Sequence, residues 1–440
     1  MANSTLSEKF RYYGFNLIDR FRSNTVKSHL HELRAFYGGS NLHGENINRN
    51  RLYAFLHQAV NTTKYYKNFQ GFTKLGDFPV LTKNMISENY DDFFSNKYNK
   101  QQLIPVTTSG SYGTPFTFYL TKNKKARQQA EVIFFGEWAG YRIGKKHAYI
   151  RVTKVKNKWK LFLQNEYLID PTHINEQWLV DQRRLLQENK IKFVIGYPSS
   201  MYAIAEYCRS RGDSKNDYML ETFISTAEPI SDEMRSRISD VFGCAVYSRY
   251  STEEFGVLAM ECIEEANHHL NTASYYFEIL DPDRDSPVSD GQVGRIVVTD
   301  IFSHAFPLIR YDTGDLGIMQ ERCSCGNRGP ILTSIDGRQV ETVYASNGER
   351  VSPFSINGAL RDVYGITQFQ FNQKNKRNYE LSLVISDLYS NNPESIISER
   401  LKNILGEDAE ISIRYVSSIS AFRSGKRPYI LSDYMKNKKE

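Results

Sequence analysis

The spacing of apolar residues changes along the chain, and each change predicts a different kind of structure. Over residues 1–70, apolar and aromatic side chains recur every three or four positions, which is typical of amphipathic helices. Between residues 126 and 247, helical patterns alternate with short β-branched runs, and this rhythm predicts a parallel sheet flanked by helices. The predicted helices cover 126–140, 176–189, 199–211 and 231–242, with Ser199 and Ser231 as N-caps of the last two, and the predicted strands cover 191–195, 221–225 and 245–247.

Residues 270–340 carry turn signals rather than helical periods. Clusters such as Asp281-Pro282-Asp283 separate short strands at 294–298 and 332–335, which indicates antiparallel pairing. Beyond residue 340, Ser346-Asn347-Gly348 predicts a tight hairpin between 340–344 and 350–351. The remaining predicted elements are helix 354–363, strands 366–373 and 378–385, helix 392–405 and strand 409–416.

These patterns predict an α/β protein of two domains. The large N-terminal domain, residues 1–340, combines a helical start at 1–70, mixed sheets flanked by helices, and an antiparallel subdomain at 270–340. The small C-terminal domain, residues 341–440, is α+β, with the boundary near residue 341.

Composition and charge exclude several classes of protein. Of the 440 residues, 40% are hydrophobic and 24% are charged, which is ordinary for a globular protein. The net charge of +6 is spread thinly, with no basic stripe among aromatic residues, so we expect no nucleic-acid partner. No run approaches the roughly 20 apolar residues of a membrane span, and the N-terminus has no apolar signal-peptide core. The chain has only five cysteines, so we expect a reducing, cytoplasmic location.

A loop of small hydroxyl residues and glycines, Thr107 to Pro115, lies between two short apolar runs. Glycine lets backbone N–H groups approach an anion, and serine and threonine hydroxyls add donors, so this loop suits a polyphosphate. Its small residues include Thr108, Ser109, Gly110, Ser111 and Gly113. It is not a Walker loop, because no Gly-Lys-Ser/Thr closes it. A serine- and threonine-rich surface hairpin is the alternative.

A second group of residues has the chemistry of a metal site. Cys323 and Cys325 form a Cys-x-Cys pair followed by glycine, and Cys262 and His269 lie upstream. Four such ligands are adequate for tetrahedral Zn²⁺, and a site closed by four protein ligands would be structural. His268 is an alternative ligand, and unconnected thiols with a surface imidazole are the alternative to a site.

Several further motifs follow one another along the chain. They are Phe78-Pro79-Val80-Leu81-Thr82-Lys83, Ala227-Glu228-Pro229, Tyr250-Ser251-Thr252-Glu253-Glu254-Phe255-Gly256, Glu261-Cys262, Pro307 to Asp315, Asp336-Gly337-Arg338 and Arg423-Ser424-Gly425-Lys426-Arg427. With the glycine-containing loop and the cysteine pair, they resemble the adenylate-forming superfamily of the acyl-CoA synthetase type. Within it, the chain is most similar to phenylacetate–CoA ligases and their relatives in capsular polysaccharide biosynthesis, over roughly residues 53–440.

The resemblance implies roles around one molecule of ATP. The loop from Thr108 to Gly113 would hold phosphates, Ala227-Glu228-Pro229 would line the nucleotide site, and Tyr250 would pack near adenine. Asp315 would accept hydrogen bonds from both ribose hydroxyls, because a carboxylate offers two acceptor oxygens. Arg338 would assist the ribose and phosphates. Tyr112 and Thr114 depart from the usual loop pattern.

Two residues would act on the reacting groups. Glu254 would hold Mg²⁺, although Ser251 and Glu253 depart from the pattern and a one-residue shift would make Glu253 the ligand instead. Lys426 would be the mobile cation that bridges the carboxylate and the α-phosphate, and a solvated basic tail is its alternative. Phenylacetate–CoA ligase relatives carry a similar Cys/His/Cys-x-Cys set, which favours the zinc interpretation.

The resemblance thus implies an AMP-forming ligase, either monomer or homodimer, with a mobile small domain. It would activate a carboxylic acid with Mg·ATP and pass the acyl group to a thiol, of CoA or a carrier, or to an amine, as in polysaccharide biosynthesis. A non-catalytic zinc-stabilised scaffold and a nucleotidyltransferase with a different acceptor are the alternatives. Phe134, Phe135, Trp138 and Tyr141 are either core residues or part of an acyl pocket.

Overall fold

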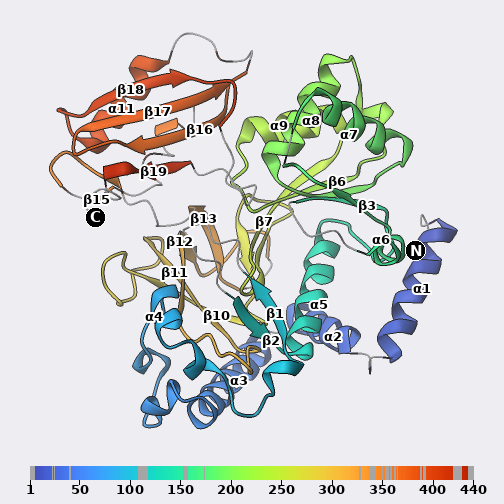
Figure 1. Ribbon diagram of the computed structural model, residues 1–440, viewed down its shortest axis with the longest axis vertical. Coiled ribbons are helices and arrows are strands. Elements are labelled where there is room, and N and C mark those ends of the chain that lie inside the picture. The colour runs from blue at the N-terminus through green and yellow to red at the C-terminus, as the bar shows by residue number, and fades with distance from the viewer. Residues whose placement is uncertain are drawn as a thin grey trace.

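Figure 1 shows the computed structural model of the chain. The structure describes residues 5–21, 23, 25–38, 41–107, 117–151, 157–172, 174–326, 329–336, 343–348, 350–351, 356, 359–360, 363, 365–386, 389, 393–419 and 429–434.

One large sheet forms the centre of the molecule. In the described part of the chain it has eleven strands in the order β10-β11-β12-β13-β9-β8-β7-β6-β5-β3-β4. The strands β4, β3, β5, β6 and β7 pair in parallel with their neighbours. The remaining pairs, from β7 through β8, β9, β13, β12 and β11 to β10, are antiparallel. Their bounds are β3 (His147–Ile150), β4 (Glu166–Ile169), β5 (Phe193–Gly196), β6 (Thr222–Thr226), β7 (Ala245–Thr252), β8 (Gly256–Glu261), β9 (His268–Leu270), β10 (Tyr275–Leu280), β11 (Val293–Asp300), β12 (Tyr311–Gln320) and β13 (Ile331–Asp336).

Helices lie beside the parallel strands of the sheet and also at the opposite end of the molecule (Figure 1). In Figure 1, α7, α8 and α9 form a layer beside β6, whereas α2, α3 and α5 lie at the other end of the molecule. The α-helices of the large domain are α1 (Leu6–Phe21), α2 (Thr25–Gly38), α3 (Asn41–Thr62), α4 (Lys83–Glu88), α5 (Lys122–Trp138), α6 (Lys158–Gln164), α7 (Glu176–Glu188), α8 (Pro198–Ser210) and α9 (Asp232–Phe242), and the 3₁₀ turns are η1 (Tyr66–Phe69), η2 (Leu75–Asp77), η3 (Tyr90–Phe93), η4 (Lys100–Gln102) and η5 (Lys215–Asp217). Among the described helices, none combines the length and the apolar character needed to cross a membrane.

The C-terminal part of the chain forms a separate, smaller unit (Figure 1). Its four-stranded sheet has the order β18-β17-β16-β19, and its buried apolar residues, from Val343 to Ile430, form their own cluster. The elements are β14 (Val343–Tyr344), β15 (Arg350–Val351), β16 (Ile366–Gln373), β17 (Asn378–Ile385), α11 (Glu394–Leu405), β18 (Glu410–Tyr415) and β19 (Ile430–Ser432). The predicted fold class, a large mixed α/β domain followed by a small α+β domain, is therefore confirmed.

Local signals predicted most helices well, with one wrong cap. Ser231 caps α9 as expected, since its side chain accepts a hydrogen bond from the Met234 amide. The prediction that Ser199 is an N-cap is wrong, because Pro198 already occupies the first turn of α8 and Tyr197 is the cap residue. Proline is favoured there because its fixed φ suits a helix start and the first-turn N–H has no helical partner to lose. The antiparallel strands of 270–340 form as expected, and they continue the large sheet.

The aromatic stripe on α5 belongs mostly to the core. Phe134 and Phe135 are buried, and Phe134 stacks on Tyr37 with ring centroids 5.1 Å apart. Tyr141, just after the helix, instead lines a large cavity. Of the two interpretations of this aromatic stripe, the core fits Phe134 and Phe135, whereas Tyr141 lines a cavity.

Candidate active site and metal centre

Two of the predicted nucleotide residues meet across the large sheet. The phenol of Tyr250, on β7, donates a hydrogen bond to Asp315 Oδ2, on β12, at 2.6 Å. The three strands β13, β9 and β8 separate β7 from β12 in the sheet order, so this contact requires the sheet to curve over. The curvature creates a concave surface, and the Tyr250 ring and the Asp315 carboxylate line the same cavity there.

Glu254 lies beside this pair, at the turn between β7 and β8. The side chain of Glu254 is only 6% exposed, accepts a hydrogen bond from the Tyr311 phenol at 3.3 Å, and pairs with Lys83 Nζ at 3.3 Å. Glu253 differs, since its carboxylate is half exposed and lies 3.5 Å from Arg151. A buried carboxylate beside the Tyr250–Asp315 pair fits an oxygen ligand for Mg²⁺.

The backbone around Glu254 is held from behind. The carbonyl of Phe255 accepts hydrogen bonds from Gln128 Nε2 at 3.0 Å and from the Tyr275 phenol. Gln128 lies on α5, the helix that follows the hydroxyl- and glycine-containing loop. These two donors fix the direction of the turn and thereby the position of the Glu254 carboxylate.

The segment before Asp315 is anchored to the motif that contains Lys83. The Leu81 amide donates to the Arg310 carbonyl at 2.8 Å, and the Asp312 amide donates to the Leu81 carbonyl at 2.9 Å. Gly314 has a positive φ of 77°, and its amide donates to Asp312 Oδ1 at 2.8 Å, which closes a tight turn. Sequence segments more than 200 residues apart thus converge on one site.

The Ala227-Glu228-Pro229 motif sits in a strained turn after β6. Ala227 has a φ of 70°, a left-handed conformation that is unfavourable for any residue with a Cβ. Glu228 secures the turn, because its Oε2 accepts a hydrogen bond from the Ser199 amide at the start of α8, at 3.3 Å. All three motif residues line the cavity described below.

The four predicted metal ligands lie together. One ligand atom from each of Cys262, His269, Cys323 and Cys325 falls within 4.8 Å of every other. Cys262 and Cys323 Sγ are 3.9 Å apart, and Cys325 Sγ lies 3.4 Å from His269 Nε2. A tetrahedral zinc site with Zn–S bonds of about 2.3 Å and a Zn–N bond of about 2.0 Å requires separations of roughly 3.8 and 3.5 Å. The donor set therefore fits Zn²⁺ in type, number and spacing.

The surroundings of the cluster agree with this fit. Burial lowers the pKa of His269, which favours the neutral imidazole that binds metals. Its ring also packs edge-on against Trp138, with centroids 5.6 Å apart. The cluster joins the end of β8, strand β9 and the turn between β12 and β13. A metal there would tie β8 and β9 to the connection that follows β12, the strand of Asp315.

Other predicted site residues lie outside the described residues. They are Thr108, Ser109, Gly110, Ser111 and Gly113 of the phosphate loop, with Arg338 and Lys426. The strands that flank the loop are described: β1 (Ile104–Thr107) pairs antiparallel with β2 (Thr117–Leu120), and the hydroxyls of Thr107 and Thr117 are 2.9 Å apart. The two strands that were predicted to flank the loop are therefore present.

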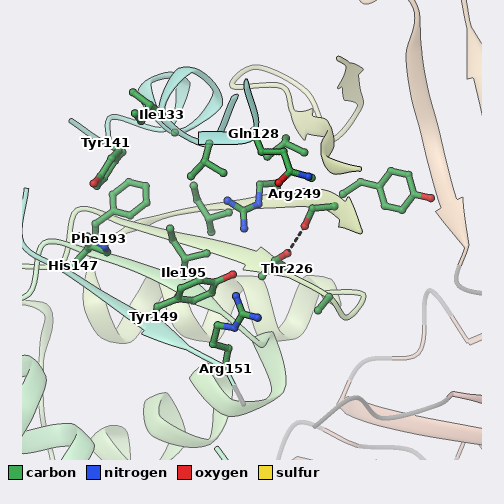
Figure 2. Close-up of a pocket in the computed structure, with 18 of the residues that line it drawn as sticks. Gln128, Ile133, Tyr141, His147, Tyr149, Arg151, Phe193, Ile195, Thr226 and Arg249 are labelled. Atoms are coloured by element: carbon green, nitrogen blue, oxygen red, sulfur yellow. Dashed lines mark hydrogen bonds between the residues drawn. The ribbon is translucent and has the colours of Figure 1, made fainter. Parts of the chain in front are cut away.

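A cavity of about 1270 Å³ connects these features. At one end it is lined by Tyr250, Glu254 and Asp315, and we call this the acidic end. Arg249 and a set of apolar side chains also line it; we call this part the arginine end, and Figure 2 shows several of these residues around the space. The apolar wall is formed by Val132, Ile133, Tyr141, Phe193, Ile195, Ile224 and Val257.

Sequence reasoning missed two charged residues, Arg249, which lines the cavity, and Lys83, which pairs with the lining residue Glu254. Lys83 belongs to a motif that was recognised, but nothing in the sequence showed that it would pair with Glu254. Arg249 directly precedes Tyr250, and its position next to a recognised motif was the one available signal.

Comparison with known proteins identifies relatives for most of the chain. Residues 222–348 match the family described as acyl-protein synthetase, LuxE, and residues 343–433 match the CapK C-terminal domain. Protein CapK of Staphylococcus aureus is 24% identical over 371 residues, which cover 82% of this chain and 80% of that protein. A phenylacetate-coenzyme A ligase of Thermus thermophilus is 34% identical over 188 residues, 41% of each chain.

Solved structures share the fold. A 2-hydroxyisobutyryl-CoA ligase in the postadenylation state, in complex with R3-HIB-AMP, superposes with a TM-score of 0.73 over 92% of this chain and 93% of that chain, at 18% identity. The same ligase in the thioesterification state gives a TM-score of 0.60. The shared fold and the matched sequences together support the adenylate-forming superfamily as the class of this chain. Within it, its relatives are CapK and the phenylacetate-coenzyme A ligases.

Proposed function

We propose that the protein is an AMP-forming ligase that activates a carboxylic acid as an acyl-adenylate. The observation that carries this proposal is the convergence of Tyr250, Glu254 and Asp315 at one end of a single cavity. These are the residues expected to contact adenine, the metal and the ribose. Relatedness to phenylacetate-coenzyme A ligases supports the same reaction class.

In the proposed reaction, a carboxylate oxygen attacks the α-phosphorus of ATP, and pyrophosphate leaves. The site must hold the ribose, bind the phosphates and offset the charge that develops during attack. Asp315 would orient the ribose, and Tyr250, hydrogen-bonded to Asp315, would pack against adenine. Glu254 would hold Mg²⁺, which supplies charge neutralisation at the phosphates. The hydroxyl and glycine residues from Thr108 to Gly113 would donate hydrogen bonds to them, with Arg338 nearby.

Lys426 would bring a positive charge to the reacting groups. It belongs to the small domain, for which we propose a boundary near residue 341 and a rotation between two reaction steps. The higher TM-score to the postadenylation form of the related ligase than to its thioesterification form is consistent with a first-step arrangement. Rotation would remove Lys426 after adenylate formation and admit the acceptor.

The acceptor would be a thiol, of coenzyme A or of a protein, or an amine. The matched families support both thiols, since they include a coenzyme A ligase and an acyl-protein synthetase. The amine option, in polysaccharide biosynthesis, rests on the resemblance of the sequence motifs alone. The cysteine and histidine cluster would hold a structural zinc ion, because four protein ligands leave no open position.

Carboxylate-dependent exchange of pyrophosphate into ATP tests this proposal. Exchange should require an acid, ATP and Mg²⁺, and a panel of aryl, aliphatic and sugar acids would find the substrate. Absence of exchange with every acid would reject the ligase and favour a non-catalytic scaffold.

Lys426→Ala separates the two half-reactions. Exchange should fall by roughly 100- to 1000-fold, as expected for loss of one charge-stabilising group. Acyl transfer from a preformed adenylate should change little. Equal loss in both steps would contradict the role proposed for Lys426.

A further inference from the structure

Arg249 is a buried cation in the wall of the cavity. It lies on β7, is 9% exposed, and lines the same cavity as Tyr250 and Glu254. Its Nε is shielded from solvent and has no hydrogen-bond partner, and no ion pair joins its guanidinium to any carboxylate of the described residues. Figure 2 shows the side chain directed into the cavity.

An arginine in this situation calls for an anion from outside the protein. Arginine cannot relieve a buried charge by losing its proton, since its pKa exceeds about 12. Burying an unpaired charge is costly, and a bound counter-ion offsets that cost.

Five of the carboxylates that line the cavity pair with basic or phenolic side chains. The ion pairs and hydrogen bonds are Glu166–His147 at 3.5 Å, Glu253–Arg151 at 3.5 Å, Glu261–Arg235 at 2.8 Å, Glu254–Lys83 at 3.3 Å and Asp315–Tyr250 at 2.6 Å. None of these acids is bonded to Arg249. The three further lining carboxylates, Asp19, Glu228 and Asp232, also form no ion pair with Arg249, so no described carboxylate of the cavity neutralises its charge.

Lys125 adds positive potential to the same cavity. Its ammonium donates to Gln128 Oε1 at 3.1 Å, and it forms no ion pair among the described residues. Burial lowers the pKa of Lys125, and the nearby cations Lys160 and Arg151 lower it further against the opposing effect of Glu253. An anion bound in this region would thus meet a field from more than one cation.

The direction of Arg249 separates it from the ribose site. Neighbouring residues of a β-strand point to opposite faces of the sheet. Tyr250 reaches Asp315, so Arg249 points to the other face, toward the wall that includes Ile195 and Val257. An anion on Arg249 would therefore belong to the acid substrate rather than to the sugar of the nucleotide.

We propose that the substrate is a dicarboxylic acid, of which one carboxylate is adenylated and the other pairs with Arg249. This inference rests on the proposed ligase function and deepens it. The apolar side chains around the guanidinium would contact the carbon chain between the two carboxylates. Arg249 would then select for a second negative charge, because an acid without one would leave the guanidinium unpaired.

Pyrophosphate exchange with matched acids tests the proposal. The probes are succinate, glutarate, adipate and phthalate, each compared with its monoamide, which has nearly the same shape and one charge fewer. For the best diacid, kcat/KM should exceed that of its monoamide by roughly 100-fold, as expected for a buried charge pair. Arg249→Met should remove most of this difference by lowering the value for the diacid, and Arg249→Lys should restore part of it. Arg184→Gln, which removes an exposed arginine of α7, should leave both values unchanged.

Three outcomes would overturn the inference. Equal loss for diacid and monoamide in Arg249→Met would place the guanidinium on the reacting carboxylate, and a raised KM for ATP alone would place it on a phosphate. A wild-type enzyme that prefers monoamides or acids without a second charge would show that the site does not recognise a second carboxylate. In these cases the ligase function stands, whereas absence of exchange with every acid rejects that function and the inference together. Unchanged AMP binding by Arg249→Met would show that the variant is folded.

Discussion

The two ends of the cavity differ in how their charged groups are satisfied. At the acidic end, Glu254 is held by Lys83 and Tyr311, and Asp315 is held by Tyr250. At the arginine end, Arg249 has no such partner among the described residues. A site whose groups are already oriented suits a ligand that never changes, such as ATP, since little reorganisation accompanies binding. A single unpaired charge suits discrimination between substrates. Variants of the acidic end should therefore affect all acids equally, and only the arginine end should change their ranking.

The largest effect should come from Glu254→Gln, compared with Glu253→Gln. Loss of the buried carboxylate should lower the exchange rate by roughly 100- to 1000-fold for every acid, because the Mg²⁺ that would offset the charge of the transition state loses its ligand. Glu253→Gln alters a half-exposed carboxylate and should cost less than about 5-fold. Steady-state exchange across Mg²⁺ concentrations measures both. The opposite ranking of the two variants would make Glu253 the metal ligand.

A second large effect should follow from Cys323→Ser. Zinc content should fall from about one atom per chain toward zero, and stability should drop by roughly 2–5 kcal/mol, since the metal links strands that hydrogen bonds alone would hold less firmly. Because the cluster supports β12, the KM for ATP should rise equally for all acids. Elemental analysis and thermal unfolding would measure the first two quantities.

Cys208→Ser is the matched control for the zinc site. Cys208 is a fully buried thiol outside the cluster, so its replacement should lower stability without loss of zinc. Wild-type protein purified without zinc would contradict the metal assignment. A change in the ranking of acids in Cys323→Ser would show that the cluster also shapes the arginine end.

The acidic end could be predicted from the sequence largely because its residues belong to recognisable motifs. Tyr250, Glu254 and Asp315 were each identified by their neighbours in the chain. Their meeting was implied by family resemblance alone, since the curvature that brings β7 to β12 arises from the whole sheet. The sequence pattern also predicted a short strand at 245–247, whereas β7 runs to Thr252. Polar residues that line a cavity interrupt the apolar pattern by which strands are recognised.

The arginine end could not be predicted in this way. Whether a buried arginine is paired depends on which carboxylates the fold brings near it, and local sequence does not contain that information. The same limit applies to Lys83, whose partner Glu254 lies 171 positions away (254 − 83). Local rules succeeded at Ser231, where cap and recipient are three residues apart, and failed at Ser199, where the preceding proline decided the helix start.

A moderate effect should follow from Tyr250→Phe. This change removes the 2.6 Å hydrogen bond to Asp315 and keeps the ring. A hydrogen bond to a charged group contributes about 1.5–3 kcal/mol, and water can replace part of it, so the KM for ATP should rise by roughly 5- to 20-fold. Exchange measured at saturating ATP should change little, and the ranking of acids should stay the same. An effect confined to particular acids would break the separation between the two ends.

The smallest effect should come from Ala227→Gly, in the turn after β6 that also lines the cavity. Ala227 adopts a φ of 70°, which costs a residue with a Cβ about 1–2 kcal/mol, and glycine removes that cost. Glycine also adds freedom to the unfolded chain, so a net gain in stability of about 0.5 kcal/mol is expected in chemical unfolding. If the strained turn helps to align ATP with the acid, the exchange rate should fall two- to threefold, roughly equally for all acids, while stability rises. A loss of stability would instead show that the alanine methyl group makes contacts that outweigh the strain.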